Sequence, residues 1–238
     1  MDNIFNNSVV FITGADGGIG KAFVAELLNR EVKKIYVAGI NTKALEDLSL
    51  VNPDLIFPIK LDVTNTVEVR QCVEHCMDTT ILINNAGVEL KASFLEEKSA
   101  AKAQFEMNVN YIGPVDLCNQ FLQLLKANSN PAIVNMLSIG SLVLIKNIST
   151  YCASKMALHL FTQAIREELV NEIKVFGVYA GYVDTSMVSD VLVDKISPGD
   201  LVRNIFNEMV LNVLDIFPDE MSKQFVNSNK LKIDNFNN

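Results

Sequence analysis

A tyrosine and a lysine stand four residues apart in the segment STYCASKMALHLF, which begins at Ser149. The apolar residues of this segment recur with helical spacing, so Tyr151 and Lys155 are predicted on one face of a helix. A phenol in water releases its proton near a pH of about 10, and a neighbouring ammonium favours the phenolate. The pair could therefore transfer a proton. In isolation, a Tyr/Lys pair at this spacing is more typical of a surface contact.

A second segment with chemical potential is the glycine-rich TGADGGIGKAF, which directly follows the apolar run VVFIT at 9–13. It places Gly14, Gly18 and Gly20 where a strand is predicted to turn into a helix. Glycines at such a turn let the backbone approach a pyrophosphate, whose charge is favoured at the helix N-terminus. The spacing is G-x-x-x-G-x-G. Three glycines opening the first helix of an α/β chain favour nucleotide binding over a simple turn.

The end of the second apolar run bears on the type of nucleotide. About 20 residues after a glycine turn, NAD sites place an acid on the ribose hydroxyls and NADP sites place an arginine. This chain has Gly39-Ile40-Asn41 there and carries neither signature. Asp16 in the turn would repel a 2′-phosphate, so electrostatics favour NAD. NADP stays open, with Asn41, Thr42 and Lys43 as candidate phosphate ligands.

These segments must be positioned by an alternation of strands and helices. Apolar, β-branched runs are found at 9–13, 34–38, 55–61, 80–84, 132–137 and 174–180, and helical patterns lie between them, including 101–127, 151–172 and about 198–214. Strands that are apolar nearly throughout and separated by helices indicate a parallel sheet covered on both faces. We therefore predict an α/β fold: one doubly wound, Rossmann-like domain over 1–238, with about seven strands and a frayed tail at about 227–238. Ligands of such folds bind outside the carboxyl ends of the strands.

Seven motifs follow one another along this framework. They are TGADGGIG at 13–20, LDVT at 61–64, NNAG at 84–87, NYIG at 110–113, Ser138, YCASK at 151–155 and GYVDT at 181–185. In their order and spacing, the chain resembles the short-chain dehydrogenase/reductase family from about Ser8 to Thr185, with a weaker continuation through the last helix. The resemblance implies an NAD(P)-dependent oxidoreductase that transfers a hydride between nicotinamide and a carbonyl or secondary alcohol.

The resemblance also implies catalytic roles for four residues. Tyr151 would be the acid/base, Lys155 its activator, Ser138 the hydroxyl that orients the substrate, and Asn110 the fourth member. The family uses a local kink at the asparagine to free a backbone carbonyl for a proton-relaying water. Gly113-Pro114 is consistent with such a distortion, because Pro114 cannot donate to the helix ladder.

Cofactor contacts are likewise carried over by position. Tyr151 and Lys155 are joined by Gly14, Asp16, Gly18, Ile19 and Gly20 in the turn, by Asp62 and Val63 at the adenine, by Asn84, Ala86 and Gly87 near the adenosine ribose, and by Gly181, Val183 and Thr185 around the nicotinamide. Asp62 has an alternative role as the N-cap of the helix that follows it. Ala180 stands where the family usually has a proline, which leaves the rigidity of that loop open.

The substrate is expected to contact the segments after the fourth, fifth and sixth strands: VELKASF, IGSLVLIKNIST and SMVSDVLV. The last two are rich in aliphatic residues, which favours an apolar carbonyl or alcohol. A rival function is a dinucleotide-sensing regulatory or scaffold protein without turnover, although a pure sensor has no physical need for Tyr151. Epimerisation is less favoured, because relatives with that activity usually carry a larger C-terminal substrate domain.

Composition excludes several other classes. The chain has 20 basic and 28 acidic residues, a formal charge of −8, and no basic run longer than Lys33-Lys34, so nucleic acid is not expected as a partner. No apolar run approaches the roughly 18 residues of a membrane span, so we expect a soluble, cytoplasmic protein with no membrane partner. Two histidines and an isolated Cys72-x3-Cys76 pair supply neither a His-based triad nor a metal site. By resemblance, a homodimer or homotetramer is expected through helices 101–127 and 151–172.

Overall fold

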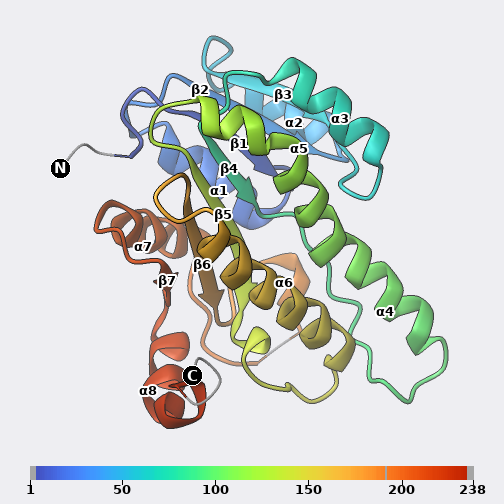
Figure 1. Cartoon of the computed structure of the whole chain (residues 1–238). Helices are drawn as coiled ribbons and strands as arrows, with labels where there is room; N and C mark the ends of the chain where they lie inside the picture. Colours follow the sequence, from blue (N-terminus) through green and yellow to red (C-terminus); the bar gives the residue numbers. More distant parts are fainter. Residues whose placement is uncertain (1–3, 191, 235–238) are drawn as a thin grey trace.

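The computed structural model describes residues 4–190 and 192–234, the last six of these by backbone alone. Its centre is a seven-stranded sheet in the order β3-β2-β1-β4-β5-β6-β7, in which every pairing is parallel (Figure 1). The strands are β1 (Val9–Thr13), β2 (Lys34–Gly39), β3 (Ile56–Lys60), β4 (Ile81–Asn84), β5 (Ala132–Ser138), β6 (Lys174–Ala180) and β7 (Asp215–Ile216). The predicted doubly wound fold is confirmed. The strand order reverses between β1 and β4, where a ligand crevice is expected.

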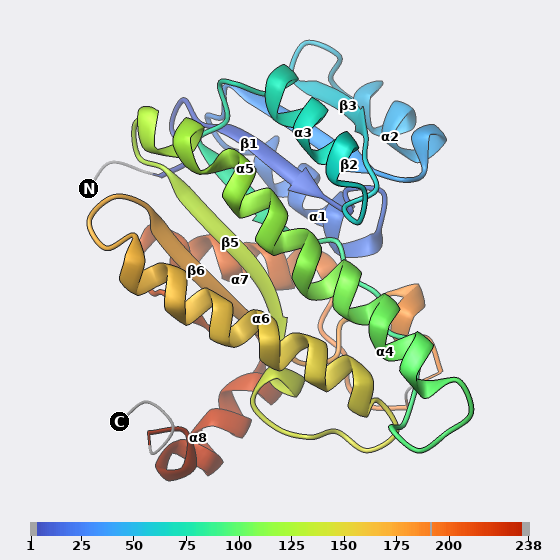
Figure 2. The same ribbon diagram turned by 45° about the vertical axis from the view of Figure 1, so that its right-hand side comes forward.

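Helices cover both faces of the sheet. They are α1 (Gly18–Leu27), α2 (Thr42–Ser49), α3 (Thr66–His75), α4 (Ser99–Met107), α5 (Gly113–Ala127), α6 (Ser149–Glu168), α7 (Pro198–Val210) and α8 (Glu220–Asp234). Helices α3, α5 and α6 lie on the face that is turned forward in Figure 2, and α1, α2 and α7 lie behind the sheet. Each layer buries one apolar stripe against the strands.

The alternation of side chains along β1 divides the core into two parts. Val10 and Ile12 point to the layer of α1, α2 and α7, whereas Val9 and Phe11 point to the layer of α3, α5 and α6. On the second side, the ring of Phe11 lies 5.0 Å from that of Phe121, between centroids. Both faces of the strand are therefore buried, which explains why the run VVFIT is apolar throughout.

The long helix predicted over 101–127 is divided in three. Helix α4 ends at Met107, a π-helical turn covers Asn108–Ile112, and α5 begins at Gly113. Pro114 lacks the amide hydrogen that a regular ladder would use, and the distortion lies in the turn before it. The turn contains Asn110, so the predicted kink is present at the predicted residue.

The C-terminal elements differ from the prediction. Helix α7 ends at Val210, before the expected Leu214, because Asn212 adopts a left-handed φ of 57° and the chain enters β7. Strand β7 has only two residues, too few for a periodic pattern. Residues 227–234, predicted to be part of a frayed tail, continue helix α8, and 235–238 lie outside the described residues.

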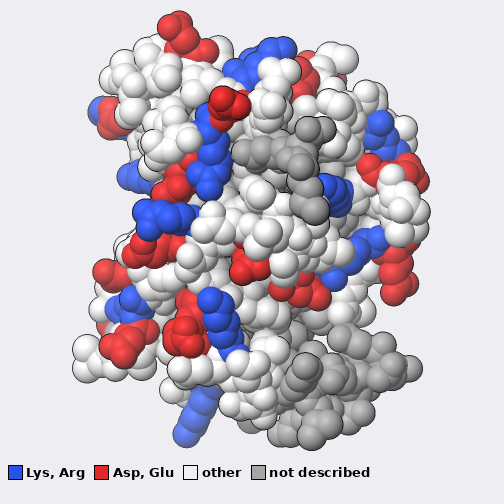
Figure 3. All heavy atoms as spheres, turned by 90° about the vertical axis from the view of Figure 1, so that its left-hand side faces the viewer, with Lys and Arg blue, Asp and Glu red and all other residues white. Residues whose placement is uncertain are grey.

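Charged side chains of both signs are interspersed on the face shown in Figure 3. Within 4–190 and 192–234, no helix combines the length and the apolar character needed to cross a bilayer.

Candidate active site

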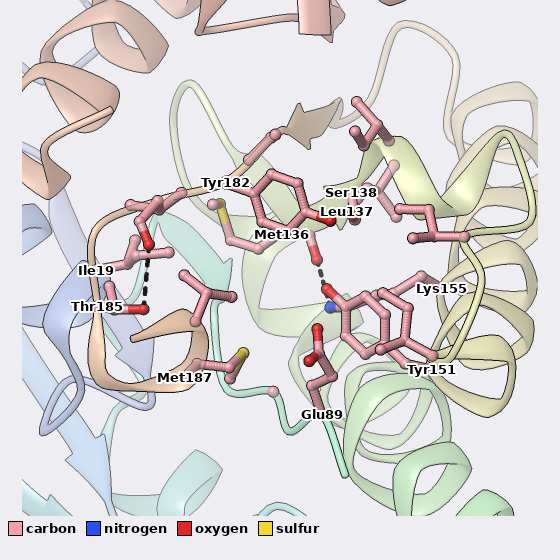
Figure 4. Close-up of a pocket in the computed structure, with 18 of the residues that line it drawn as sticks. Ile19, Glu89, Met136, Leu137, Ser138, Tyr151, Lys155, Tyr182, Thr185 and Met187 are labelled. Atoms are coloured by element: carbon pink, nitrogen blue, oxygen red, sulfur yellow. Dashed lines mark hydrogen bonds between the residues drawn. The ribbon is translucent and has the colours of Figure 1, made fainter. Parts of the chain in front are cut away.

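Two adjoining pockets open along the carboxyl ends of the central strands. The first contains Ser138, Tyr151 and Lys155, and the second contains the glycine turn (Figure 4 shows the first). The pockets share Ile19, Asn85, Gly87, Thr185 and Met187. Together they form one site that extends along the sheet edge from the segment after β3 to the end of β6.

The glycine turn is held in place by contacts that tolerate no side chain. Gly14 has a φ of +62°, and a Cβ there would lie 2.8 Å from Ala86 Cα. A Cβ on Gly20 would lie 2.2 Å from the carbonyl oxygen of Gly14. Helix α1 begins at Gly18 with no acidic residue in its first turn, so its N-terminus can accept an anion such as a pyrophosphate. The residues present therefore fit a dinucleotide.

Almost all predicted cofactor residues line these pockets. They are Gly14, Asp16, Gly18, Ile19, Gly20, Asp62, Val63, Ala86, Gly87, Tyr151, Lys155, Gly181, Val183 and Thr185. The exception is Asn84.

Asn84 lies beneath the site and not on its wall. It is fully buried beneath the site, where its Nδ2 donates to Asn135 Oδ1 at 2.8 Å. Its neighbour Asn85 faces the pockets instead, and the Asn85 Nδ2 donates to the carbonyl oxygens of Thr13 at 2.9 Å and Gly14 at 3.1 Å. Successive residues at a strand end point to opposite sides, so one residue of register decides which asparagine faces the ligand.

Asp62 was predicted either to contact the cofactor or to cap the helix that follows it, α3. Asn65 caps α3, because its Oδ1 accepts the amide hydrogens of Val67 at 3.1 Å and Glu68 at 3.3 Å. The capping alternative for Asp62 is therefore wrong. Its Oδ1 accepts from the Thr64 amide at 2.9 Å, a local turn that leaves Asp62 on the wall of the second pocket.

Tyr151 and Ser138 meet in the first pocket. Burial raises the pKa of the Tyr151 phenol, whereas a side-chain hydrogen bond with Ser138 lowers it. Ser138 is fixed at the end of β5, where its Oγ accepts the Gly140 amide hydrogen at 3.0 Å. The hydroxyl groups of Ser138, from β5, and Tyr151, from α6, therefore both face the first pocket.

Lys155 is buried and points into the same pocket. Its Nζ lies 5.8 Å from the centroid of the Tyr151 ring and donates to the Met136 carbonyl oxygen at 2.7 Å. Burial lowers the pKa of Lys155 to about 8. A cation close to the phenol favours the phenolate, in opposition to the burial of Tyr151.

Asn110 does not line either pocket. It is fully buried on the π-helical turn, where its Oδ1 accepts from the Val88 amide at 2.8 Å and its Nδ2 donates to the Val88 carbonyl at 2.8 Å. The same Nδ2 donates to Ser154 Oγ at 2.9 Å. The side chain therefore ties the segment after β4 to α6, next to the pocket that holds Lys155.

The pockets also contain residues that were not predicted individually. Among them are Asn85, Glu89, Ile145, Ile148, Tyr182 and Met187. Asn85 stood in the NNAG motif and could have been found there. Tyr182 likewise stood in the GYVDT motif. The remaining four, Glu89, Ile145, Ile148 and Met187, lie in the segments that were predicted to contact the substrate, and tertiary packing decides that their side chains face the pocket.

Comparison with known proteins decides the family. A family model described as short chain dehydrogenase matches residues 8–195. The chain belongs to the short-chain dehydrogenase family. The coarse class of oxidoreductase follows for this chain.

Several known proteins are similar to this short-chain dehydrogenase. A short chain dehydrogenase from Burkholderia cenocepacia J2315, solved in complex with NADP, is 30% identical with a TM-score of 0.89, covering 95% of this chain and 94% of that one. An oxidoreductase of Staphylococcus aureus (strain USA300) is 29% identical over 192 residues, which are 78% of this chain and 82% of that protein. A 3-ketodihydrosphingosine reductase from Bacteroides thetaiotaomicron is 31% identical over 165 residues, 68% of this chain and 58% of the reductase.

Proposed function

We propose that this chain transfers a hydride between a nicotinamide dinucleotide and a carbonyl or secondary alcohol, with Tyr151 as the acid/base. The observation that carries the proposal is the convergence of Ser138, Tyr151 and Lys155 on a pocket that adjoins the glycine-turn pocket. A sensor of dinucleotides would need no acid/base such as Tyr151 beside the nicotinamide. Membership of the short-chain dehydrogenase family supports the same assignment.

The residues of the first pocket divide the chemistry among them. A bound nicotinamide dinucleotide supplies or accepts the hydride. The Tyr151 hydroxyl gives its proton to the carbonyl oxygen in reduction and takes it from the alcohol in oxidation. Ser138 hydrogen-bonds the same oxygen and holds it in place, while the Lys155 ammonium stabilises the phenolate that forms.

The substrate end of the pocket supports an apolar molecule. Its walls include Leu137 near the end of β5, together with Ile139, Ile145, Ile148 and Val188 from the segments after β5 and β6. These side chains exclude water from the reacting oxygen and bind hydrocarbon.

For the cofactor, we propose NAD as the preferred dinucleotide. The Asp16 carboxylate lies beside Gly39 at the end of β2, where its Oδ2 accepts the Asn41 amide hydrogen at 2.9 Å. A carboxylate thus reaches the β2 end from the glycine turn, at the place where NAD sites carry their acid. Lys43, the cation considered for a 2′-phosphate, pairs with Asp47 at 2.5 Å. The similar Burkholderia structure contains NADP, so the preference needs its own measurement.

The decisive experiment compares the wild type with Tyr151→Phe. Aldehydes and ketones are screened with NADH and NADPH by nicotinamide absorbance, and cofactor affinity is measured for both proteins. We expect Tyr151→Phe to bind cofactor as the wild type does and to lose roughly 10²–10⁴-fold in turnover, the usual contribution of a positioned acid/base. If both proteins bind cofactor and neither oxidises it with any carbonyl, the sensor or scaffold function replaces this proposal.

We also propose a homodimer or homotetramer that pairs through the layer of α4, α5 and α6. Several large apolar side chains of this layer are exposed, among them Met156 and Leu160 on α6 and Ile112 on the π-helical turn before α5. Helices α4 and α6 contact each other, so these side chains belong to one continuous layer.

A further inference from the structure

Glu89 places a carboxylate inside the first pocket. The side chain is half-buried and points toward Tyr151 and Lys155 (Figure 4). The walls around it are largely aliphatic. Among the residues that the structure describes, none donates a hydrogen bond to this carboxylate or pairs with it. A carboxylate in this position offers a charged hydrogen-bond acceptor to a molecule that binds beside Tyr151 and Lys155.

The backbone on both sides of Glu89 is held rigidly. Asn110 bonds both the amide and the carbonyl of Val88 at 2.8 Å, and Glu106 Oε1 accepts the Leu90 amide hydrogen at 2.7 Å. The backbone is thus held in place immediately before and after Glu89, whose side chain lines the first pocket. The segment that carries the carboxylate is therefore preorganised.

Nearby cations are already engaged. Lys91 pairs with Asp190 outside the pocket, and Lys155 donates to the Met136 carbonyl oxygen. Glu106 is fully buried, and its Oε2 has no hydrogen-bond partner among the described residues. Burial, together with the charges of Glu106 and Asp190, raises the pKa of Glu89, although Lys91 opposes it. No described cation is paired with Glu89, and a bound cation would supply that partner.

We infer that the substrate is an amino ketone or amino alcohol whose ammonium group pairs with Glu89 while its oxygen meets Ser138 and Tyr151. The inference rests on the proposed function and names its substrate class. Glu89 is then a residue that determines specificity. An ammonium is favoured over a neutral donor because it neutralises the carboxylate as well as hydrogen-bonding it. The aliphatic walls receive the rest of the molecule.

Three small probes of equal shape separate the possibilities. Isopropanolamine, propylene glycol and sec-butanol carry an ammonium, a hydroxyl and a methyl group at the same position beside a secondary alcohol. Their binding to the protein with NADH present is measured by calorimetry, and their oxidation with NAD is measured separately. The variants are Glu89→Gln and a matched control, Glu97→Gln, whose glutamate is exposed on the same connection between β4 and α4 and lines neither pocket.

The wild type and Glu97→Gln are expected to bind isopropanolamine at least about tenfold more tightly than sec-butanol, as one charge-assisted hydrogen bond allows. Glu89→Gln is expected to lose this preference.

Equal affinity for the probes, a preference for propylene glycol, or a preference that survives in Glu89→Gln would each overturn the inference. Oxidation without an ammonium preference would refute the inference alone. An ammonium preference in binding, with no oxidation of any alcohol or reduction of any carbonyl, would refute the proposed function.

Discussion

At the scale of single residues, the site depends on charges whose surroundings differ from those of exposed side chains. Lys155 is a buried cation that is bonded to a carbonyl oxygen, with no carboxylate ion pair within the described part of the chain. Asp16, in the glycine turn, brings a carboxylate to the end of β2, and β2 itself ends without an acidic residue. Each can be tested by a substitution that removes its charge.

Lys155→Met is expected to stabilise the protein while abolishing catalysis. Burial moves the pKa of Lys155 from 10.5 to about 8. That shift means that burying the charged lysine costs the wild type about 3 kcal/mol of folding free energy at neutral pH. The variant avoids this cost but loses the hydrogen bond to Met136, which destabilises it by about 1 kcal/mol. We therefore expect urea denaturation at pH 7 to show a free energy of unfolding about 2 kcal/mol higher for the variant.

The pH dependence of that gain has a definite sign. Below a pH of about 8 the lysine is charged in both states and the full cost is present. Between about 8 and 10.5 the unfolded chain binds more protons, so the stability of the wild type rises and the advantage of Lys155→Met shrinks. Lys126→Met, which removes a partly exposed lysine paired with Glu172, should change stability by less than about 0.5 kcal/mol. A pH-independent difference would contradict this account of Lys155.

Asp16→Asn is expected to shift cofactor preference. The amide keeps the shape of the side chain and removes the charge that opposes a 2′-phosphate, so the dissociation constant for NADPH should fall about tenfold while that for NADH changes little. Fluorescence titration with both cofactors measures this, with exposed Asp54→Asn as the control. A wild type that already prefers NADPH by more than about tenfold would show that Asp16 does not set the preference.

At the scale of elements, the turn between β1 and α1 and the π-helical turn between α4 and α5 position the chemistry. The first brings backbone amides to the second pocket, and the second directs Asn110 onto Val88. Both are departures from regular structure that local residues specify: glycines in the first and Pro114 beside the second.

Gly20→Ala is expected to damage the turn severely. The new methyl group would lie 2.2 Å from the Gly14 carbonyl oxygen and 2.6 Å from Ala15 Cα, so backbone must move. We expect a loss of about 3 kcal/mol or more in the free energy of unfolding, together with weaker dinucleotide binding. Gly199→Ala is the matched control, because a Cβ there meets no atom within 4 Å in helix α7. It should be neutral or stabilise by up to about 1 kcal/mol. Equal melting temperatures for the two variants would count against this explanation of the turn.

At the scale of the whole molecule, the layer of α4, α5 and α6 carries the exposed apolar surface expected of an interface. Leu160 on α6 is 67% exposed, and Ile112 on the π-helical turn before α5 is 50% exposed. Apolar side chains of this size on neighbouring helices favour association with a second copy.

Leu160→Glu is expected to weaken that association. A charge placed in an apolar interface should raise the dissociation constant of the dimer at least about tenfold, as measured by sedimentation velocity. Leu50→Glu, at the end of α2 in the other layer and 73% exposed, is the matched control and should leave the sedimentation coefficient unchanged. A wild type that sediments as a monomer at all concentrations would rule out the proposed assembly.

The sequence by itself determined the order of strands and helices from β1 to α7, because periodicity, glycines and Pro114 act on the chain locally; it did not determine β7 and α8. It also brought Ser138, Tyr151 and the glycine turn to the same edge of the sheet, since parallel strands end together there. Tertiary structure alone decided which way side chains face. It put Asn85 rather than Asn84 at the pockets, laid Asp16 beside Gly39, and left Glu89 without a partner among aliphatic walls. Burial and pairing are sums of contacts from segments far apart in the chain, and no local pattern records them.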